Sequence, residues 1–263
     1  MVSQFGKGDY AKKVESSIAF NDPTSQGFRV KLLYTATNNR IVFLNQHIAM
    51  STSTQLLIAT NNKGKLRELS QLFSDLPLNC ITLNEAGFDI EVEETGATYG
   101  ENALLKATIL HRESRLLTLA DDSGLEVDAL DGRPGIHAAR YAGPNATNQD
   151  RWNKLLNELK DVPDAQRTAR FKCAIALVAQ GMPPITVEGV CEGRIAFAPS
   201  GNGGFGYDPI FFIPEYNCTM AELDETIKNK ISHRARAAVK AKEILREWIK
   251  KYFRSASHKT SEV

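Results

Sequence analysis

The sequence has few features that would commit it to a membrane, to disulfide cross-links or to a zinc site. It contains only four cysteines in 263 residues, widely spaced and without a C-x-x-C pair. This spacing fits neither a zinc ribbon nor the disulfide framework of a secreted domain, so reduced and mostly buried thiols are expected. No apolar run reaches the roughly 18 residues of a membrane span, and no segment resembles a signal peptide. We therefore expect a cytoplasmic protein with no membrane partner.

The sequence also lacks an excess of charge of either sign. It contains 32 Lys and Arg residues against 31 Asp and Glu residues, for a formal net charge of +1. A protein that coats a polyanion needs a surplus of basic residues, so nucleic-acid binding is not expected and any anion site must be local. The length is sufficient for one large α/β domain, or two small ones, with a substantial core.

The first 54 residues differ in composition from those that follow. They contain three glycines, one proline, several asparagines and one short apolar run, and they end in the low-complexity run Ser51-Thr52-Ser53-Thr54 just after a candidate translation start at Met50. We predict that 1–54 is an N-terminal extension outside the core fold, that 55–252 forms the main domain and that 253–263 is a polar tail.

Two adjacent carboxylates interrupt an apolar run near the middle of the chain. Residues 116–120 predict a buried strand that ends at Asp121 and Asp122. Strands of open α/β sheets deliver ligand-binding groups at their carboxyl ends, and a divalent cation would relieve the repulsion between neighbouring carboxylates. An ordinary Asp-Ser-Gly turn would explain the same residues, so the local pattern leaves both interpretations open.

A candidate anion site precedes these aspartates. The short apolar strand at 56–59 is followed by Thr60-Asn61-Asn62-Lys63-Gly64-Lys65 and then by a helical pattern of leucines. The free N–H groups and positive end of a helix favour phosphate. The segment is not a P-loop, because it lacks the second glycine and the hydroxyl residue of that motif. A loop with solvated lysines is the alternative.

Acidic residues between these two segments have different interpretations. Glu93 and Glu94 either form a solvated run or bring carboxylates to the same cation as Asp122. Thr98 and Glu101 have the spacing of a capping box, so Glu101 is interpreted as a helix cap.

Further along, Thr147 is predicted to cap a helix. Alternating residues at 169–177 predict a strand, with a neighbour at 187–191. The core is thus expected to alternate helices and strands.

The glycine-rich segment 201–206 matches G-x-G-x-x-G but is not a dinucleotide fingerprint. It leads into a strand-like run at 210–213, whereas the fingerprint must open a helix. Two interpretations remain. One is a loop that allows close backbone approach to a ligand, with Phe205 and Tyr207 stacking on a flat ring, and the other is a tight hairpin with core aromatics.

The last candidate site opens a long helix near the C-terminus. Ser232 is a suitable N-cap residue, and His233 and Arg234 would then occupy the first turn. The helix dipole disfavours cations in that position, so this arrangement suggests an anionic partner.

Several of these motifs together resemble the inosine triphosphate pyrophosphatase family. They are Thr60-Asn61-Asn62-Lys63-Gly64-Lys65, Glu93-Glu94-Thr95-Gly96, Glu101-Asn102-Ala103, Asp121-Asp122-Ser123-Gly124, Pro134-Gly135-Ile136 with Ala139-Arg140-Tyr141, Gly203-Gly204-Phe205-Gly206-Tyr207-Asp208-Pro209 and Ser232-His233-Arg234. The resemblance runs in order from about Gln55 to about Tyr252, so residues 55–252 are expected to be an NTP pyrophosphatase domain.

The resemblance implies an α/β, two-lobed fold around a long mixed twisted β-sheet, with flanking helices and an active-site cleft between the lobes. It also implies a homodimer that uses Mg²⁺ to hydrolyse ITP, dITP and XTP to the monophosphate and pyrophosphate. Such an enzyme cleanses the nucleotide pool, so that these bases are not incorporated into DNA or RNA.

Site residues follow from motif position under the same resemblance. The triphosphate would be held by Thr60, Asn61, Asn62, Lys63, Gly64 and Lys65. The metal would be held by Glu94 and Asp122, with Asp122 also accepting the proton and Asp121 supporting the site. The nucleotide would contact Ser123, Phe205, Gly206, Tyr207, Asp208, Lys228, His233 and Arg234.

Two other functions are compatible with the sequence. The chain could be a pyrophosphatase for modified pyrimidine triphosphates, which a substrate panel distinguishes. It could also be a nucleotide-sensing module without turnover, since an anion cradle and stacking aromatics alone would allow binding.

Overall fold

The structure is a computed structural model that describes residues 14–19, 29–34, 36–37, 40–41 and 54–258, with side chains described for 54–251. The chain divides into two compact units, Met1–Thr52 and Ser53–Val263. The candidate start at Met50 and residues 259–263 lie outside the described residues. The first unit contains two antiparallel strand pairs: β1 (Val14–Ala19) with β2 (Arg29–Tyr34), and β3 (Ala36–Thr37) with β4 (Arg40–Ile41).

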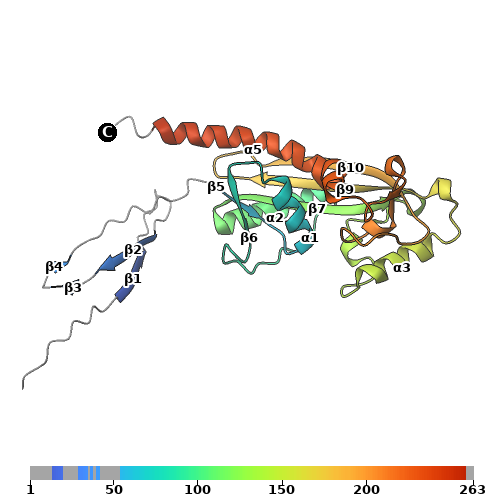
Figure 1. Ribbon diagram of the computed structural model, residues 1–263, viewed down its shortest axis with the longest axis horizontal. Coiled ribbons are helices and arrows are strands. Elements are labelled where there is room, and N and C mark those ends of the chain that lie inside the picture. Colours follow the sequence, from blue (N-terminus) through green and yellow to red (C-terminus); the bar gives the residue numbers. More distant parts are fainter. Residues whose placement is uncertain (1–13, 20–28, 35, 38–39, 42–53, 259–263) are drawn as a thin grey trace, which may run out of the picture. The chain divides into compact units, whose positions relative to one another are not determined.

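A mixed eight-stranded sheet forms the centre of the second unit (Figure 1). Its strands are β5 (Thr54–Ile58), β6 (Leu78–Thr82), β7 (Leu117–Val127), β8 (Pro134–Gly135), β9 (Thr168–Val178), β10 (Ile185–Ile195), β11 (Phe211–Ile213) and β12 (Cys218–Thr219). The order is β12-β11-β10-β9-β7-β5-β6, with β8 paired to β7. Strand β5 is parallel to β6 and β7, and the other pairs are antiparallel. The predicted α/β fold around a long mixed sheet is confirmed.

Helices cover both faces of this sheet. They are α1 (Lys63–Leu72), α2 (Tyr99–Ser114), α3 (Asn148–Glu158), α4 (Glu225–Ile231) and α5 (His233–His258). Short 3-10 turns are η1 (Asp128–Leu130), η2 (Ala138–Arg140), η3 (Asp164–Gln166), η4 (Asp208–Ile210) and η5 (Pro214–Tyr216). Apolar residues of α1 and α5 share one buried cluster, whereas those of α2 pack in another cluster on the opposite sheet face. Figure 1 shows α5 lying along β9 and β10.

Three long strands connect two parts of this unit, here called lobes. One lobe contains the clusters around α1, α2 and α5, and the other contains the cluster around α3 and β11. Strands β7, β9 and β10 each have 11 residues, long enough to pass from one hydrophobic cluster into the next. In β7, for example, Leu119 packs with α1 and α5, whereas Val127 packs in a cluster that contains Leu155 of α3 and Phe211 of β11. The sheet is therefore continuous while its cores are separate, which leaves space for a cleft between the lobes.

Local sequence signals position the helices near this cleft. Thr147 caps α3 in a capping box with Asp150, and the Ser232 hydroxyl accepts from the Ala235 N–H at the start of α5. Thr98 also caps α2, but the Glu101 carboxylate accepts from the N–H of Ala97 instead of that of Thr98. The predicted capping box therefore differs in its second hydrogen bond, which Glu101 accepts from the residue before the N-cap and not from the N-cap itself.

The strand that carries the two aspartates does not end there. Strand β7 continues to Val127, so the prediction that it stops at Asp121 is wrong, and so is the turn alternative. The pairing of β7 with β5 ends at Leu119, opposite Ile58, while its pairing with β9 extends to Val127. The aspartates therefore lie just beyond the carboxyl end of β5, beside the segment that leads to α1.

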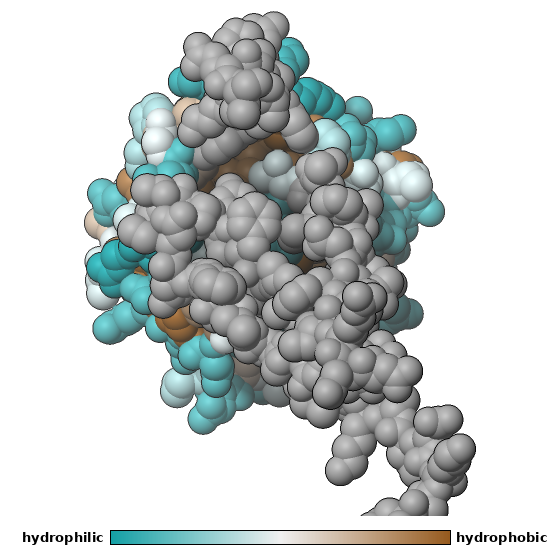
Figure 2. Space-filling view, turned by 90° about the vertical axis from the view of Figure 1, so that its left-hand side faces the viewer, coloured by the Kyte–Doolittle hydropathy of each residue, from teal (hydrophilic) through white to brown (hydrophobic). Residues whose placement is uncertain are grey.

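Among the described residues, no helix is long and apolar enough to cross a membrane. On the face shown in Figure 2, hydrophilic residues predominate around the edge of the described surface, with hydrophobic residues in smaller areas between them.

Candidate active site

Two adjoining cavities lie between the lobes. The first, here called the aromatic cavity, has a volume of about 220 Å³ and rings from Phe171, Phe205 and Tyr207. The second, here called the polar cleft, has a volume of about 650 Å³ and is lined by charged residues that include Glu94, Lys106 and Asp122. Both cavities share Asn62, Lys65, Ser123 and Ala139, so a single ligand can extend from one into the other.

Most residues predicted for the site line one of these cavities. The polar cleft contains Thr60, Asn61, Asn62, Lys65, Glu94, Asp122 and Ser123. The aromatic cavity contains Asn62, Lys65, Ser123, Phe205, Gly206, Tyr207, Asp208, Lys228, His233 and Arg234. Lys63 and Gly64 line neither cavity. Gly64 instead allows close packing, since a Cβ there would lie 2.6 Å from Cδ1 of Phe205.

The predicted anion cradle at the start of α1 is partly closed by its own N-cap. The side-chain oxygen of Asn62 accepts hydrogen bonds from the N–H groups of Gly64 and Lys65, at 2.9 and 3.1 Å. Those two N–H groups are therefore already satisfied within the protein. The charge that α1 offers to the cavities comes mainly from the Lys65 ammonium.

Asp121 and Asp122 do not form a pair of repelling carboxylates. Successive side chains of a strand point to opposite faces of the sheet. Asp121 contacts Lys65 of α1 and Arg234 of α5, whereas Asp122 contacts Asn102 of α2. The two carboxylates therefore have different direct partners, and whether they share one cation stays a prediction.

The environment of Asp122 suits a proton acceptor. One carboxylate oxygen accepts from Asn102 Nδ2 at 3.1 Å, and the other accepts from the Ser123 N–H at 2.9 Å. Burial raises the pKa of Asp122 above its ordinary value and Glu94 adds to this rise, while Lys106 opposes it. A carboxylate with a raised pKa in a cleft is a stronger base than one in water.

Oxygen atoms beside Asp122 form a cation-binding arrangement. The Lys106 ammonium lies 2.6 Å from Glu94 Oε1, 2.8 Å from the Asp121 carbonyl oxygen and 3.8 Å from Asp122 Oδ1. Among the described residues, no group of three or more His, Cys, Asp or Glu side chains is arranged to hold a metal. Mg²⁺ usually takes one or two carboxylates and completes its shell with water and substrate phosphate, so Glu94 and Asp122 fit this ion.

Asp121 belongs to a buried network of alternating charges. Its Oδ2 lies 3.1 Å from Lys65 Nζ and 3.3 Å from Arg234 Nε. Arg234 also pairs with Glu68, and Glu68 pairs with Lys228 at 2.7 Å. Burial alone would raise the pKa of Asp121, but the charges of Lys65 and Arg234 lower it below its ordinary value. Asp121 is therefore an anion that orients cations facing the cavities.

This network also explains the unusual start of α5. Burial lowers the pKa of His233 well below its ordinary value, with contributions from Arg234 and Lys228, so the imidazole is neutral. It stacks on Phe171 with ring centroids 4.7 Å apart, and its Nδ1 is buried without a hydrogen-bond partner. The expected anionic partner of Arg234 consists of Glu68 and Asp121, so this first turn does not by itself require an anionic ligand.

The glycine-rich loop forms one wall of the aromatic cavity. The Asp208 carboxylate accepts from the N–H of Phe205 at 2.8 Å and from Lys228 Nζ at 2.6 Å, which fixes the loop over α4. The Phe205 ring lies within 5.4 Å of both the Lys228 and Arg234 charges. The Tyr207 hydroxyl donates to the Ala138 carbonyl at 2.9 Å. These contacts hold the Phe205 and Tyr207 rings in place in the cavity that His233 also lines.

The sequence is similar to those of known proteins. The Ham1 family profile matches residues 56–244. The chain is 50% identical over 189 residues to the dITP/XTP pyrophosphatase of Geobacillus kaustophilus, covering 72% of this chain and 93% of the relative. It is 49% identical over 192 residues to the dITP/XTP pyrophosphatase of Geobacter sulfurreducens, covering 73% and 96%. The chain belongs to the Ham1 family.

Solved structures of Ham1 proteins share the fold. The HAM1 protein of Coxiella burnetii superposes with a TM-score of 0.68 at 42% identity, covering 74% of this chain and 99% of that protein. The Ham1 protein of Staphylococcus aureus superposes with a TM-score of 0.67 at 40% identity, with the same coverage.

Sequence reasoning missed several residues that contact the predicted site residues. Lys106 and Asn102 both reach Asp122 from α2, and their i, i+4 spacing places them on one helix face. Lys106 follows two leucines in the sequence. A lysine within an apolar helical stretch is the feature that could have indicated a buried, functional position. The sequence around Glu68 of α1 gave less indication of its role, because its partners Lys228 and Arg234 lie far away in the sequence.

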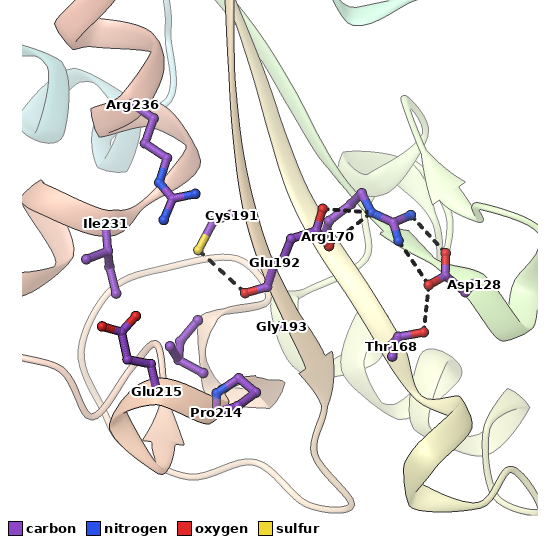
Figure 3. Close-up of a pocket in the computed structure, with 11 residues that line it drawn as sticks. Asp128, Thr168, Arg170, Cys191, Glu192, Gly193, Pro214, Glu215, Ile231 and Arg236 are labelled. Carbon is purple, nitrogen blue, oxygen red and sulfur yellow. Dashed lines mark hydrogen bonds and ion pairs between the residues drawn. The ribbon is translucent and has the colours of Figure 1, made fainter.

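A further cavity of about 480 Å³ lies outside this site (Figure 3). Arg170 crosses one side of it and is bound by Asp128 and Glu192, as the dashed lines show. Arg236 donates to the Val190 carbonyl oxygen. Burial raises the pKa of Cys191 to about 11, so its thiol is protonated at neutral pH. The cavity shares no residue with the aromatic cavity or the polar cleft.

Proposed function

We propose that this protein hydrolyses deaminated purine nucleoside triphosphates, namely ITP, dITP and XTP, to the monophosphate and pyrophosphate. This activity would keep these bases out of DNA and RNA by removing their triphosphates from the nucleotide pool. The observation that carries the proposal is the continuity of the aromatic cavity with the polar cleft, in which a carboxylate with a raised pKa adjoins several cations. The similarity to dITP/XTP pyrophosphatases supports the choice of substrate.

The aromatic cavity is the proposed base site. Phe205 and Tyr207 provide flat surfaces on which a purine can stack. His233 and Arg234 provide hydrogen-bonding groups for a 6-oxo group, and a site built for that group rejects the 6-amino group of adenine. Asp208 holds the loop that carries both rings, because its carboxylate accepts a hydrogen bond from the Phe205 N–H.

The polar cleft is the proposed triphosphate site. Lys65 lies where the two cavities meet, and Lys106 lies beside Asp122, so both can offset the negative charge of the phosphates. Asp122 orients a water molecule and accepts its proton as the oxygen attacks the α-phosphorus and pyrophosphate leaves. Glu94 and Asp122 would hold Mg²⁺, which when bound neutralises charge that develops on the phosphate oxygens.

A homodimer and a cytoplasmic location complete the proposal: the homodimer rests on the family resemblance, and the location rests on the expectation of reduced cysteines. Sedimentation equilibrium of the purified protein tests the dimer, and a solution mass equal to that of one 29.1 kDa chain would contradict it.

A substrate panel with a catalytic variant tests the activity. We expect pyrophosphate release from ITP, dITP and XTP with Mg²⁺ and little release from ATP or GTP. Asp122→Asn should reduce kcat by about 100-fold or more, because it removes the proton acceptor. Asp128→Asn is a matched control, since Asp128 pairs with Arg170 outside both cavities. Equal turnover of the standard dNTPs, or undiminished activity of Asp122→Asn, would contradict the proposal.

A further inference from the structure

Arg151 differs from the other cations of the aromatic cavity. It lies in the first turn of α3 and lines the cavity, and its Nη1 donates to Asn148 Oδ1 at 2.9 Å. Its Nε is buried without a hydrogen-bond partner. Among the residues described with side chains, no carboxylate oxygen lies within 4.0 Å of its guanidinium nitrogens. Lys65, Lys228 and Arg234, by contrast, are each paired with buried carboxylates.

The position of Arg151 is unfavourable without a further partner. The N-terminus of a helix carries partial positive charge, so a cation in the first turn of α3 is repelled. Its neighbour Asp150 is occupied by the cap, where its carboxylate accepts from the N–H and hydroxyl of Thr147 at 2.8 and 2.6 Å. A buried donor without an acceptor adds a further cost. An acceptor supplied by a ligand in the cavity that pairs with the Arg151 guanidinium would offset the repulsion.

The chemistry of a guanidinium selects among the candidate bases. It has only donors, so it can pair with a carbonyl oxygen or a ring anion but not with an amino group. Xanthine carries a 2-oxo group and loses a ring proton near neutral pH. Hypoxanthine has only hydrogen at the 2-position, and guanine has an amino group there. A guanidinium without a carboxylate partner in a base cavity therefore favours xanthine over hypoxanthine and disfavours guanine.

Donors that line the aromatic cavity come from two different helices. Arg234 and His233 enter from α5, and Arg151 enters from α3. The 2-oxo and 6-oxo groups of xanthine flank the same ring nitrogen and point in different directions, so donors from two elements can reach them. α3 itself is held to the glycine-rich loop by Trp152 Nε1, which donates to the Gly206 carbonyl oxygen at 2.6 Å.

We propose that Arg151 is a specificity-determining residue that donates to the 2-oxo edge of xanthine and makes the enzyme prefer XTP to ITP. The inference rests on the proposed function, because it requires that both triphosphates be hydrolysed at this site.

Steady-state pyrophosphate release by the full-length protein tests the inference. We expect a higher kcat/KM for XTP than for ITP in the wild type. Arg151→Gln should lower kcat/KM for XTP by about tenfold, the size of one hydrogen bond to a charged group, and should lower that for ITP much less. Arg151→Lys should recover part of the XTP activity. Lys160→Gln removes the same charge from an exposed position after α3 and should leave the ratio of XTP to ITP activity unchanged.

The outcomes separate this inference from the proposed function. ITP turnover by Arg151→Gln reports that the variant is folded, so a selective loss of XTP activity supports the inference. Equal losses for both substrates, an unchanged ratio, or a wild-type preference for ITP would overturn it while leaving the proposed function intact. Failure of the wild type to release pyrophosphate from either substrate would overturn both.

Discussion

Asp121 is a fully buried carboxylate whose sequence neighbour Asp122 has different contacts. Both residues belong to the same motif, yet Asp121 faces Lys65 and Arg234, and Asp122 faces α2. The supporting role expected for Asp121 is consistent with these contacts and stays a prediction. The alternation of side chains along β7 is what separates the two aspartates.

The importance of Asp121 for stability can be measured by replacing it with asparagine. Removing one partner from a buried ion network leaves uncompensated charge, here on Lys65 and Arg234. We expect Asp121→Asn to lower the free energy of unfolding by about 3 to 5 kcal/mol in urea titrations. Asp161→Asn is the control, since Asp161 is 88% exposed and its loss should cost less than about 0.5 kcal/mol. Similar values for the two variants would contradict this role.

The difference in unfolding free energy between the wild type and Asp121→Asn has a defined pH dependence. The pKa of Asp121 is lower in the folded chain than in the unfolded chain. Its stabilising contribution is therefore complete above the unfolded pKa and is lost as the pH falls through the folded pKa. The stability difference between the wild type and Asp121→Asn should be constant above about pH 5 and should shrink below about pH 4. A difference that grows on acidification would be inconsistent with a depressed pKa.

Helix α5 positions two cavity residues through its contact with β10. Gly189 of β10 lies directly beneath the first turns of α5, where a Cβ would come within 2.1 Å of the His233 carbonyl oxygen and 2.4 Å of the Ala237 nitrogen. Only glycine allows this approach. Because His233 and Arg234 line the aromatic cavity, the packing of the helix on the strand determines where they lie.

Substitution at Gly189 tests this dependence. Gly189→Ala should push the start of α5 away from β10, lowering stability by about 1 to 3 kcal/mol and kcat/KM for ITP by up to about 100-fold. Gly100→Ala is the matched control, because a Cβ there meets its nearest neighbour at 3.6 Å and the residue lies at the start of α2. Full activity of Gly189→Ala would show that the site does not depend on this contact.

The whole chain consists of two compact units, and both cavities are lined by residues of the second unit. The family match also begins inside that unit, at residue 56. Strand β5 begins at Thr54, one residue before the predicted start of the main domain. Helix α5 continues to His258, so residues 253–258 of the predicted polar tail are helical. The assignment of 1–54 as an extension outside the core stays a prediction.

Removal of the first unit tests that assignment. A chain starting at Ser53 should retain kcat/KM for ITP within about twofold and unfold in a single cooperative transition, because a domain with its own core folds independently. Steady-state kinetics and thermal unfolding of the shortened and full-length proteins provide the measurement. A large loss of activity in a chain that still unfolds cooperatively would give residues 1–52 a part in function.

The sequence by itself determined the local structure and the family of this protein. Thr147 and Ser232 cap their helices as expected, because N-capping joins residues only two or three positions apart. The glycine-rich loop leads into β11, which local pattern also predicts. The order of the short motifs was sufficient to suggest the pyrophosphatase resemblance, since each motif lies within a few residues.

Only the tertiary structure decided which charges meet. Arg234 lies 166 positions from Glu68 and 113 positions from Asp121, and no local pattern relates residues so distant. Lys106 reaches Asp122 because α2 packs on one face of β7, whereas Lys65 reaches Asp121 because α1 and α5 pack on the other. Strand pairing and helix packing place these groups, and the resulting burial sets their pKa values. The two adjacent aspartates of one motif thus have different partners because they face opposite sides of the sheet, and the role of Asp122 as proton acceptor stays a prediction.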